Sequence, residues 1–150
     1  MSLIQQLRDE IKSAMKSGDS FSLGVLRMLS AALQNKGIEN RGKGKPEELS
    51  DDEAQAVLQK EMKKRQDAVL LYEQGGRADL AEQEKKEAEF IKKYLPAQMS
   101  RAEVEVIIAD ILSKSNFTGM GDAMKAAMAV LKGRADGKLV GEIIKEKLKA

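Results

Sequence analysis

Apolar residues recur every three to four positions along most of this chain and seldom alternate one by one. That spacing places apolar side chains along one face of a helix, whereas alternation would indicate a strand. Aromatic residues make up only 3% of the sequence and Trp is absent. A core must therefore be built from Leu, Ile, Val, Ala and Met, which suits helix-on-helix packing. The pattern predicts an all-α protein.

The N-terminal part is expected to begin with a helical hairpin. One apolar stripe runs from Leu3 to Met15, and a second helix should end near residues 35–37. Residues 36–49 lose this periodicity and collect glycines and a proline among Lys and Arg. That composition is typical of an exposed, weakly ordered loop.

Two longer helices should follow the loop. Ser50 and Glu53 form a capping box, and helical spacing then continues up to Gly75 and Gly76. A strongly charged helix with a thin apolar stripe comes next, and such a helix should lie at the surface with one edge inward.

Pro96 marks a boundary between two domains, residues 1–95 and 96–150, because proline disfavours helix in the residue before it. Ser100 and Glu103 form a second capping box directly after it. The C-terminal domain should be a small three-helix bundle, since three short one-sided stripes can bury their apolar faces only against one another. The stripes begin at Val104, Met120 and Leu139.

Composition excludes several kinds of function. At 150 residues, with 42% apolar and 33% charged residues, the chain has the composition of a soluble globular protein. It contains no Cys and no His, which removes disulfides, thiol nucleophiles, imidazole bases and ordinary zinc sites. No apolar run is long enough to span a membrane, and no signal segment begins the sequence. We expect a cytoplasmic protein without catalytic residues, metal or cofactor.

A glycine-rich stretch and two acidic stretches are weak candidates for sites. Residues 37–44 resemble a phosphate-binding GxxxxGK[ST] loop, but Gly44 replaces the Ser or Thr, and a helix precedes the stretch where a strand is required. The acidic residues at 51–53 suit the start of a helix. Those at 82–89 alternate with Lys, as a solvated helix face does. Acid–base or magnesium chemistry at these acids is the less favoured interpretation.

A basic cluster on the long third helix allows two interpretations. Lys60, Lys63, Lys64 and Arg65 lie within two turns, and Glu61 is placed to pair with Arg65. The cluster either aids solubility or forms a stripe that faces phosphates.

The turn between the last two expected helices is a stronger candidate. Gly133 can end one helix in the left-handed conformation and Asp136 can cap the next. The turn then projects Lys132, Arg134 and Lys138 near the amide-rich start of the final helix, a corner that suits a phosphate group. Capping alone also explains Gly133 and Asp136, so a purely structural role stays open.

A methionine series precedes this turn. Met120, Met124 and Met128 repeat every four residues, which favours filling of the core between short helices over a groove for a partner.

Several short motifs, taken together and in this order, resemble the YqeY-like family. The resemblance extends over essentially the whole chain. The motifs are SLGVLRML at 22–29, KRQD at 64–67, GRADL at 76–80, YLPAQMS at 94–100, MG at 120–121 with Met124 and Met128, KGRADGKLV at 132–140 and IKEKL at 144–148.

The family is related to the tail domain of the B subunit of Asp/Glu-tRNA amidotransferase. The resemblance implies an all-α protein with an N-terminal helical part, a C-terminal three-helix part and a connection to tRNA. In the amidotransferase the tail engages the tRNA body, whereas activation with ATP and glutamine hydrolysis take place elsewhere. Gly121, Gly133, Asp136 and Gly137 are structural positions of the family motif, and Gly141 departs from the family, which more often has Asn there.

These observations favour a small, non-catalytic adaptor that binds tRNA, with no DNA or membrane partner. Lys132, Arg134 and Lys138 are the first candidates for phosphate contacts, followed by Lys125 and Lys145. Residues 98–150 also carry nine Lys and Arg against seven Asp and Glu.

Two alternatives stay open. One is carbon-nitrogen ligase activity with glutamine as amide donor, although the chain lacks an evident activated nucleophile. The other is a helical module that docks onto a protein such as an aminoacyl-tRNA synthetase or an amidotransferase subunit.

Overall fold

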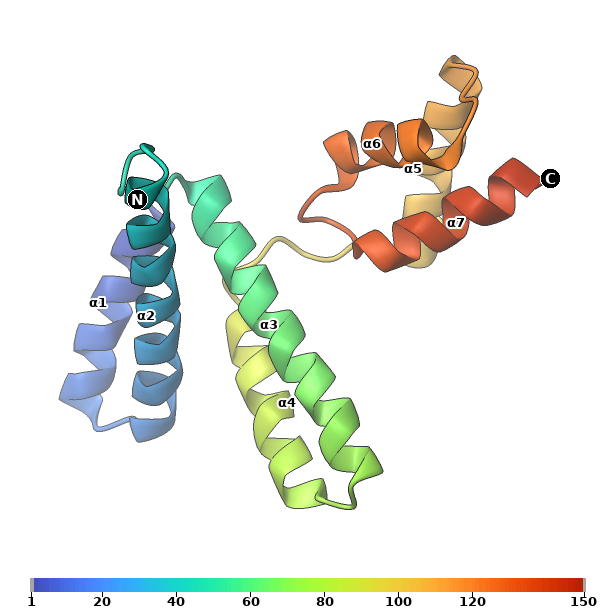
Figure 1. Cartoon of the computed structure of the whole chain (residues 1–150). Coiled ribbons are helices and arrows are strands. Elements are labelled where there is room, and N and C mark those ends of the chain that lie inside the picture. Colours follow the sequence, from blue (N-terminus) through green and yellow to red (C-terminus); the bar gives the residue numbers. More distant parts are fainter. Residues whose placement is uncertain (1, 150) are drawn as a thin grey trace. The chain divides into compact units, whose positions relative to one another are not determined.

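The computed structural model describes residues 2–149 and is built from helices (Figure 1). Seven α-helices are present, and the described residues contain no strand. The predicted all-α fold is confirmed. The chain divides into two compact units between Leu95 and Pro96. Each unit is built around its own core of buried aliphatic side chains.

Four helices make up the N-terminal unit: α1 (Leu3–Ser17), α2 (Ser20–Gly42), α3 (Asp51–Gln74) and α4 (Ala78–Lys92). Within it, α1 lies beside α2 and α3 beside α4 (Figure 1). Gly18 ends α1 in the left-handed region with φ 73°, so the chain can reverse at once into α2. The most deeply buried side chains of this unit include Leu7, Leu26, Leu29, Leu58 and Ile91.

The second helix is longer than predicted. The sequence indicates an end near residues 35–37, but α2 continues to Gly42. Asn40 is only 3% exposed, and its side chain donates a hydrogen bond of 3.1 Å to Oε1 of Glu53 at the start of α3. This contact holds the last turns of α2 against α3. The expected weakly ordered loop is therefore wrong for residues 36–42, and most of the 37–44 stretch is helix, which cannot form a phosphate cradle.

Gly37 allows the connection between α2 and α3 to pass close to α2. A Cβ atom at Gly37 would lie 2.8 Å from the carbonyl oxygen of Glu47. Gly37→Ala should therefore lower the free energy of unfolding by roughly 1–3 kcal/mol, the usual cost of overpacking. Gly24, also in α2, has nothing within 4 Å of such an atom, so Gly24→Ala should raise the free energy of unfolding by up to about 1 kcal/mol. Urea unfolding curves of the two variants should shift in opposite directions, and shifts in the same direction would contradict this packing.

Three helices make up the C-terminal unit: α5 (Arg101–Lys114), α6 (Met120–Leu131) and α7 (Gly137–Lys149). The predicted capping boxes are present at both helix starts where they were expected, Ser50 with Glu53 and Ser100 with Glu103. All three helices of this unit pack against one another. Their shared core consists of Val104, Ile108, Ala123, Ala127, Leu131, Ala135, Val140, Ile143 and Ile144.

The methionine series of α6 lies beside the core instead of filling its centre, which is occupied by the alanines of α6. Met124 and Met128 pack against the core as predicted, whereas Met120 is 40% exposed. The tips of these side chains reach α7. A Cβ atom at Gly137 would lie 4.0 Å from Cε of Met124 and Met128, and one at Gly141 would lie 3.6 Å from Cε of Met120. A side chain larger than glycine at position 141 would therefore contact Met120.

Candidate nucleic-acid interface

The turn between α6 and α7 is closed by its own backbone. The N–H of Lys132 donates to the carbonyl oxygen of Met128 at 3.0 Å, and the N–H of Arg134 donates to that of Leu131 at 2.9 Å. Gly133 has φ 81°, in the left-handed region that a residue with a side chain enters only at a cost. The chain can therefore leave α6 and reverse direction before α7 begins.

The segment that precedes α5 fixes this turn from outside. The N–H of Met99 donates to the carbonyl oxygen of Arg134 at 2.9 Å, and Nε2 of Gln98 donates to that of Gly133 at 3.3 Å. Ala135 is 8% exposed and belongs to the core of the unit. Sequence reasoning missed Gln98 and Met99, because no local spacing connects them with residues 35 positions away.

Asp136 lies at the start of α7. Its Oδ1 accepts a hydrogen bond of 3.3 Å from the N–H of Lys138, and its carbonyl oxygen accepts one of 3.0 Å from the N–H of Val140. Gly137 is the first residue of α7. Gly121 lies in the first turn of α6, where a Cβ atom would meet nothing within 4 Å. The side chains of the turn thus extend from a backbone that is hydrogen-bonded on both sides.

The three cations of this turn face solvent. Lys132, Arg134 and Lys138 are exposed, and none of them forms an ion pair with any residue from 2 to 149. Asp136 is an exposed acid within the same turn, but its carboxylate contacts the backbone of Lys138. With three cations and one acid the turn keeps a net charge of +2, and none of its cations is paired with an acid of the described residues.

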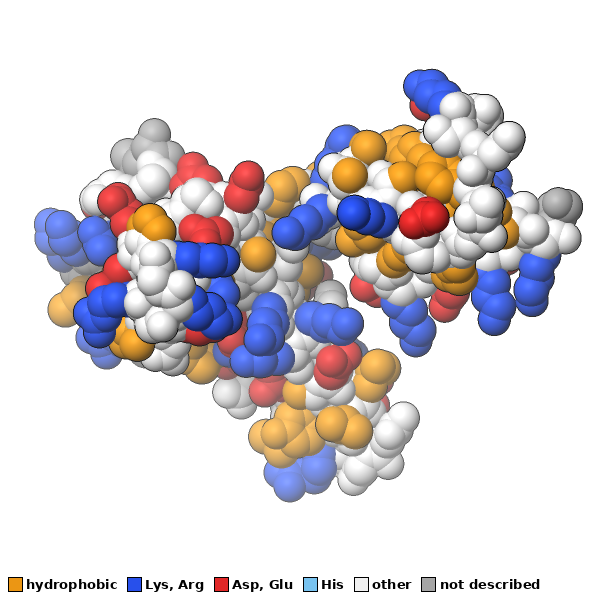
Figure 2. Space-filling view, turned by 45° about the horizontal axis from the view of Figure 1, so that its top comes forward, with side chains coloured by type: hydrophobic (Ala, Val, Ile, Leu, Met, Phe, Trp, Pro, Cys, Tyr) orange, Lys and Arg blue, Asp and Glu red, His pale blue; other side chains and the backbone are white. Residues whose placement is uncertain are grey.

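Two further exposed cations continue this pattern along the helices. Lys125 lies seven residues before Lys132, and Lys145 lies seven residues after Lys138. Seven residues are close to two helical turns, so Lys138 and Lys145 share one face of α7 about 10 Å apart along its axis, while Lys132 follows the last residue of α6 directly. Neither Lys125 nor Lys145 has an ion-pair partner within the described part of the chain. Lys and Arg side chains project into solvent from this unit in Figure 2.

The cations of α5 behave differently. Arg101 pairs with Glu105 at 2.9 Å and with Glu146 at 2.8 Å, and Lys114 pairs with Asp110 at 2.9 Å. Hydrogen bonds to Glu105 and then Glu146 raise the pKa of Arg101. Within this unit, the unpaired cations described above therefore lie on α6, the turn and α7.

The family model for YqeY-like proteins matches residues 4–148. The chain belongs to the YqeY-like family. It is 28% identical over 114 residues to "Altered inheritance of mitochondria protein 41, mitochondrial" of Lachancea thermotolerans, a match that covers 74% of this chain and 58% of that protein. It is 29% identical over 104 residues to the protein of the same description from Clavispora lusitaniae, covering 69% and 58%. The matches thus take in less than two thirds of the length of these relatives.

The basic cluster on α3 of this YqeY-like protein does not form one solvent-facing stripe. Arg65 is only 9% exposed, and it pairs with Glu61 at 2.7 Å, as predicted, and with Glu87 of α4 at 3.5 Å. Burial raises the pKa of Glu61, but hydrogen bonds from Arg65 and Lys64 outweigh that effect and leave the pKa below its ordinary value. Only Lys60 and Lys63 of the cluster are exposed without an ion pair to another described residue. The interpretation of Arg65 as a phosphate contact is therefore wrong.

The acids of residues 51–53 make hydrogen bonds that stabilise helix ends. Oδ1 of Asp51 accepts a hydrogen bond of 3.0 Å from the N–H of Leu3, and Glu53 completes the capping box of α3. Across residues 2–149, the acids nowhere form a group of three or more arranged to hold a metal ion. In the same residues, every helix is too short or too polar to cross a membrane.

Proposed function

We propose that this YqeY-like protein is a small, non-catalytic adaptor that binds tRNA. Lys132, Arg134 and Lys138 contact phosphates of the RNA backbone, and Lys125 and Lys145 extend the contact along the two helices. Phosphate contacts by Lys and Arg supply most of the affinity of such interfaces.

The observation that carries this proposal is the difference in ion pairing among the cations of the C-terminal unit. The turn cations are exposed and have no ion-pair partner in the described structure, whereas Arg101 and Lys114 are paired with acids. A paired cation must give up its partner to reach a phosphate, but an unpaired one releases only counterions. The fixed backbone of the turn further reduces the entropy lost on binding.

The resemblance to the amidotransferase tail domain supports tRNA as the nucleic acid. Contacts through phosphates alone would not select tRNA from other polyanions, so the shape of the folded RNA must contribute. The chain is also poor in aromatic residues, at 3%, which argues against recognition by stacking on unpaired bases.

Filter binding with tRNA over a range of salt concentrations tests the proposal. The logarithm of the binding constant should fall linearly with the logarithm of salt concentration, with a slope of about −3 or steeper for three to five phosphate contacts. Duplex DNA at equal phosphate concentration should compete weakly, because its grooves and backbone spacing differ from those of folded RNA. The absence of salt-sensitive tRNA binding would refute the proposal.

A further inference from the structure

Four cations lie on the α1–α2 hairpin, in the unit that the proposed tRNA contact does not use. Arg8, Lys12 and Lys16 follow one another at intervals of four residues along α1, and Arg27 lies on α2. All four side chains are exposed, and none forms an ion pair with any residue from 2 to 149. We call these four residues the basic hairpin face.

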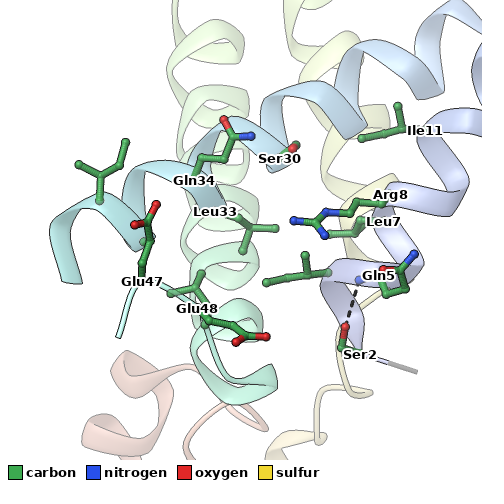
Figure 3. Close-up of a pocket in the computed structure, with 14 residues that line it drawn as sticks. Ser2, Gln5, Leu7, Arg8, Ile11, Ser30, Leu33, Gln34, Glu47 and Glu48 are labelled. Carbon is green, nitrogen blue, oxygen red and sulfur yellow. Dashed lines mark hydrogen bonds between the residues drawn. The ribbon is translucent and has the colours of Figure 1, made fainter. Parts of the chain in front are cut away.

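The two helices present these cations on the same side of the hairpin. Arg8 of α1 lines one groove with Ser30 of α2, and its side chain extends toward α2 (Figure 3). Arg27 precedes Ser30 by three residues and Lys12 follows Arg8 by four, so each shares a helix face with a residue of that groove. Since a tight turn at residues 18–19 joins the helices, Lys12, six residues before it, and Arg27, eight residues after it, lie at similar heights.

Two of the three acids closest in sequence to these cations face α4 instead. Glu10 and Asp19 line a separate small hollow together with Phe90 of α4. Asp9, the third acid, is exposed on α1, and its Oδ1 accepts a hydrogen bond of 3.0 Å from Nε2 of Gln5. Four cations and Asp9 together leave the basic hairpin face with a net charge of +3.

Two more acids mark the end of this surface. Glu47 and Glu48, from the connection between α2 and α3, line the same groove as Arg8 (Figure 3). Glu47 passes over Gly37 near the end of α2 and pairs with Arg41 at 3.0 Å. Both acids thus lie at the end of the hairpin that is remote from its turn. The positive charge is therefore concentrated toward the turn, with Arg8 at the edge of the basic hairpin face.

Helix stability does not explain this row of cations. Like charges four residues apart on one helix repel each other, whereas opposite charges at that spacing stabilise it. Arg8 with Lys12, and Lys12 with Lys16, both have the unfavourable spacing. Elsewhere in the same unit a cation three residues from an acid forms a salt bridge, as Lys64 does with Glu61 at 3.1 Å. A row of unpaired cations along one helix face is typical of a surface that binds a polyanion.

We infer that the basic hairpin face is a second contact for the phosphate backbone of the RNA. The identity of the ligand rests on the tRNA binding proposed above, but the face shares no residue with the turn between α6 and α7. Successive cations on α1 lie about 6 Å apart along the helix axis, so the row covers about 12 Å and reaches several phosphates of one strand. Ser30 and Gln34 supply neutral hydrogen-bonding groups for phosphate and sugar oxygens beside this row.

An anionic membrane fits the basic hairpin face less well. Binding to a membrane surface depends on apolar side chains that enter the bilayer as well as on charge. Leu3, Leu7 and Ala14 of α1 are buried in the core of the N-terminal unit. Of the described large apolar side chains that are exposed, α1 contributes Met15 alone, at 58%. Little apolar surface is therefore left for insertion.

Filter binding of the full chain with bulk tRNA tests the contribution of this face. The double variant Lys12→Gln/Arg27→Gln should make the slope of log affinity against log salt concentration less steep by about 1.8, because each lost phosphate contact removes about 0.9. Both side chains are exposed without an ion pair to another described residue, and Gln is a good helix former, so the variant should keep its fold.

The matched control removes one Arg and one Lys from the same unit. Arg77 is paired with Asp79 at 3.3 Å and Lys85 with Glu73 at 2.9 Å, so Arg77→Gln/Lys85→Gln should leave the slope nearly unchanged. Equal slopes for this control and for the hairpin variant would overturn the inference, because net charge alone would then account for the loss.

A methyl probe separates this contact from the one at the C-terminal turn. Met15 follows Lys12 by three residues and so lies on the basic hairpin face, whereas Met28 contacts Arg65 through its Sδ at 3.5 Å. In the full chain with methyl-labelled Met, bulk tRNA at about 50 mM salt should shift the signal of Met15 and leave that of Met28 in place. The shift of Met15 should be lost in Lys12→Gln/Arg27→Gln.

The outcomes distinguish this inference from the proposed function. Salt-sensitive tRNA binding with an unshifted Met15 signal would overturn the second contact and leave the tRNA proposal intact, whereas the absence of any salt-sensitive tRNA binding would refute both. Vesicles of phosphatidylserine and phosphatidylcholine that shift the Met15 signal where tRNA does not would also overturn the inference and would assign the face to a membrane.

Discussion

Replacing Arg134 and Lys138 by alanine together should weaken tRNA binding roughly sixtyfold at about 0.1 M salt. Each phosphate contact contributes close to 0.9 to the slope of log affinity against log salt concentration, so the loss of two contacts lowers that slope by about 1.8. Between 1 M and about 0.1 M salt, which is one logarithmic unit, this change amounts to about 1.8 logarithmic units of affinity. Both side chains are exposed and unpaired within the described structure, so the variant should keep its fold. Filter binding from about 50 to about 200 mM salt measures both quantities.

The matched control removes one Arg and one Lys from the same unit. Arg101 and Lys114 are paired with acids, so the double variant Arg101→Ala/Lys114→Ala should leave the salt slope nearly unchanged. Equal slopes for the two double variants would show that net charge, and not the turn, determines binding.

The second prediction with a large expected effect concerns the stability of the protein and not its binding of RNA. Arg65→Ala should lower the free energy of unfolding of the N-terminal unit by about 3 kcal/mol, the lower end of the cost of breaking a buried ion pair, because it leaves the partly buried Glu87 without its cation and Glu61 with Lys64 alone. Both tyrosines, Tyr72 and Tyr94, belong to this unit. Tyrosine fluorescence during urea unfolding therefore reports on it selectively.

The same variant should show a characteristic pH dependence. In the native protein the pKa of Glu61 is lowered from 4.5, so its ion pair stabilises the fold above pH 4.5 and the contribution is lost as pH falls through the folded pKa. Without Arg65, the protonated, neutral form of Glu61 is favoured over its charged form. The difference in free energy of unfolding between the native protein and the variant should therefore shrink as pH falls below about 4.5.

Lys63→Ala provides the control for Arg65→Ala. Lys63 lies on the same helix, is exposed and has no ion pair to another described residue, so its removal should change the free energy of unfolding by no more than about 0.5 kcal/mol. Arg65→Ala should also leave the salt slope of tRNA binding unchanged. A variant that kept its stability but lost salt-dependent binding would contradict the structural role of Arg65.

Helix positions could be predicted where their signals are local. The capping boxes at Ser50 and Ser100 depend on residues three positions apart, and both are present. The end of α2 could not be predicted in this way. Its last turns depend on the contact of Asn40 with Glu53, thirteen positions away, and on the close passage of Glu47 over Gly37. A glycine-rich composition therefore indicated a loop where tertiary contacts stabilise a helix.

At the candidate site, too, local patterns could be predicted and contacts between distant segments could not. Spacing alone indicated a turn with Gly133 and Asp136, because helix ends leave local patterns. The hydrogen bonds from Gln98 and Met99 to that turn join segments far apart in the sequence. The ion pair of Arg65 with Glu87 likewise joins α3 to another helix, α4. Which cations are paired and which are free is a property of the tertiary structure.

Sequencing of RNA cross-linked to the protein in cells tests the tRNA contact most directly, provided that the native chain is compared with Arg134→Ala/Lys138→Ala at equal protein levels. The proposal predicts enrichment of tRNA with the native protein and loss of most of that enrichment with the double variant. Cross-linked RNA that follows total RNA abundance, or equal tRNA enrichment for both proteins, would contradict it.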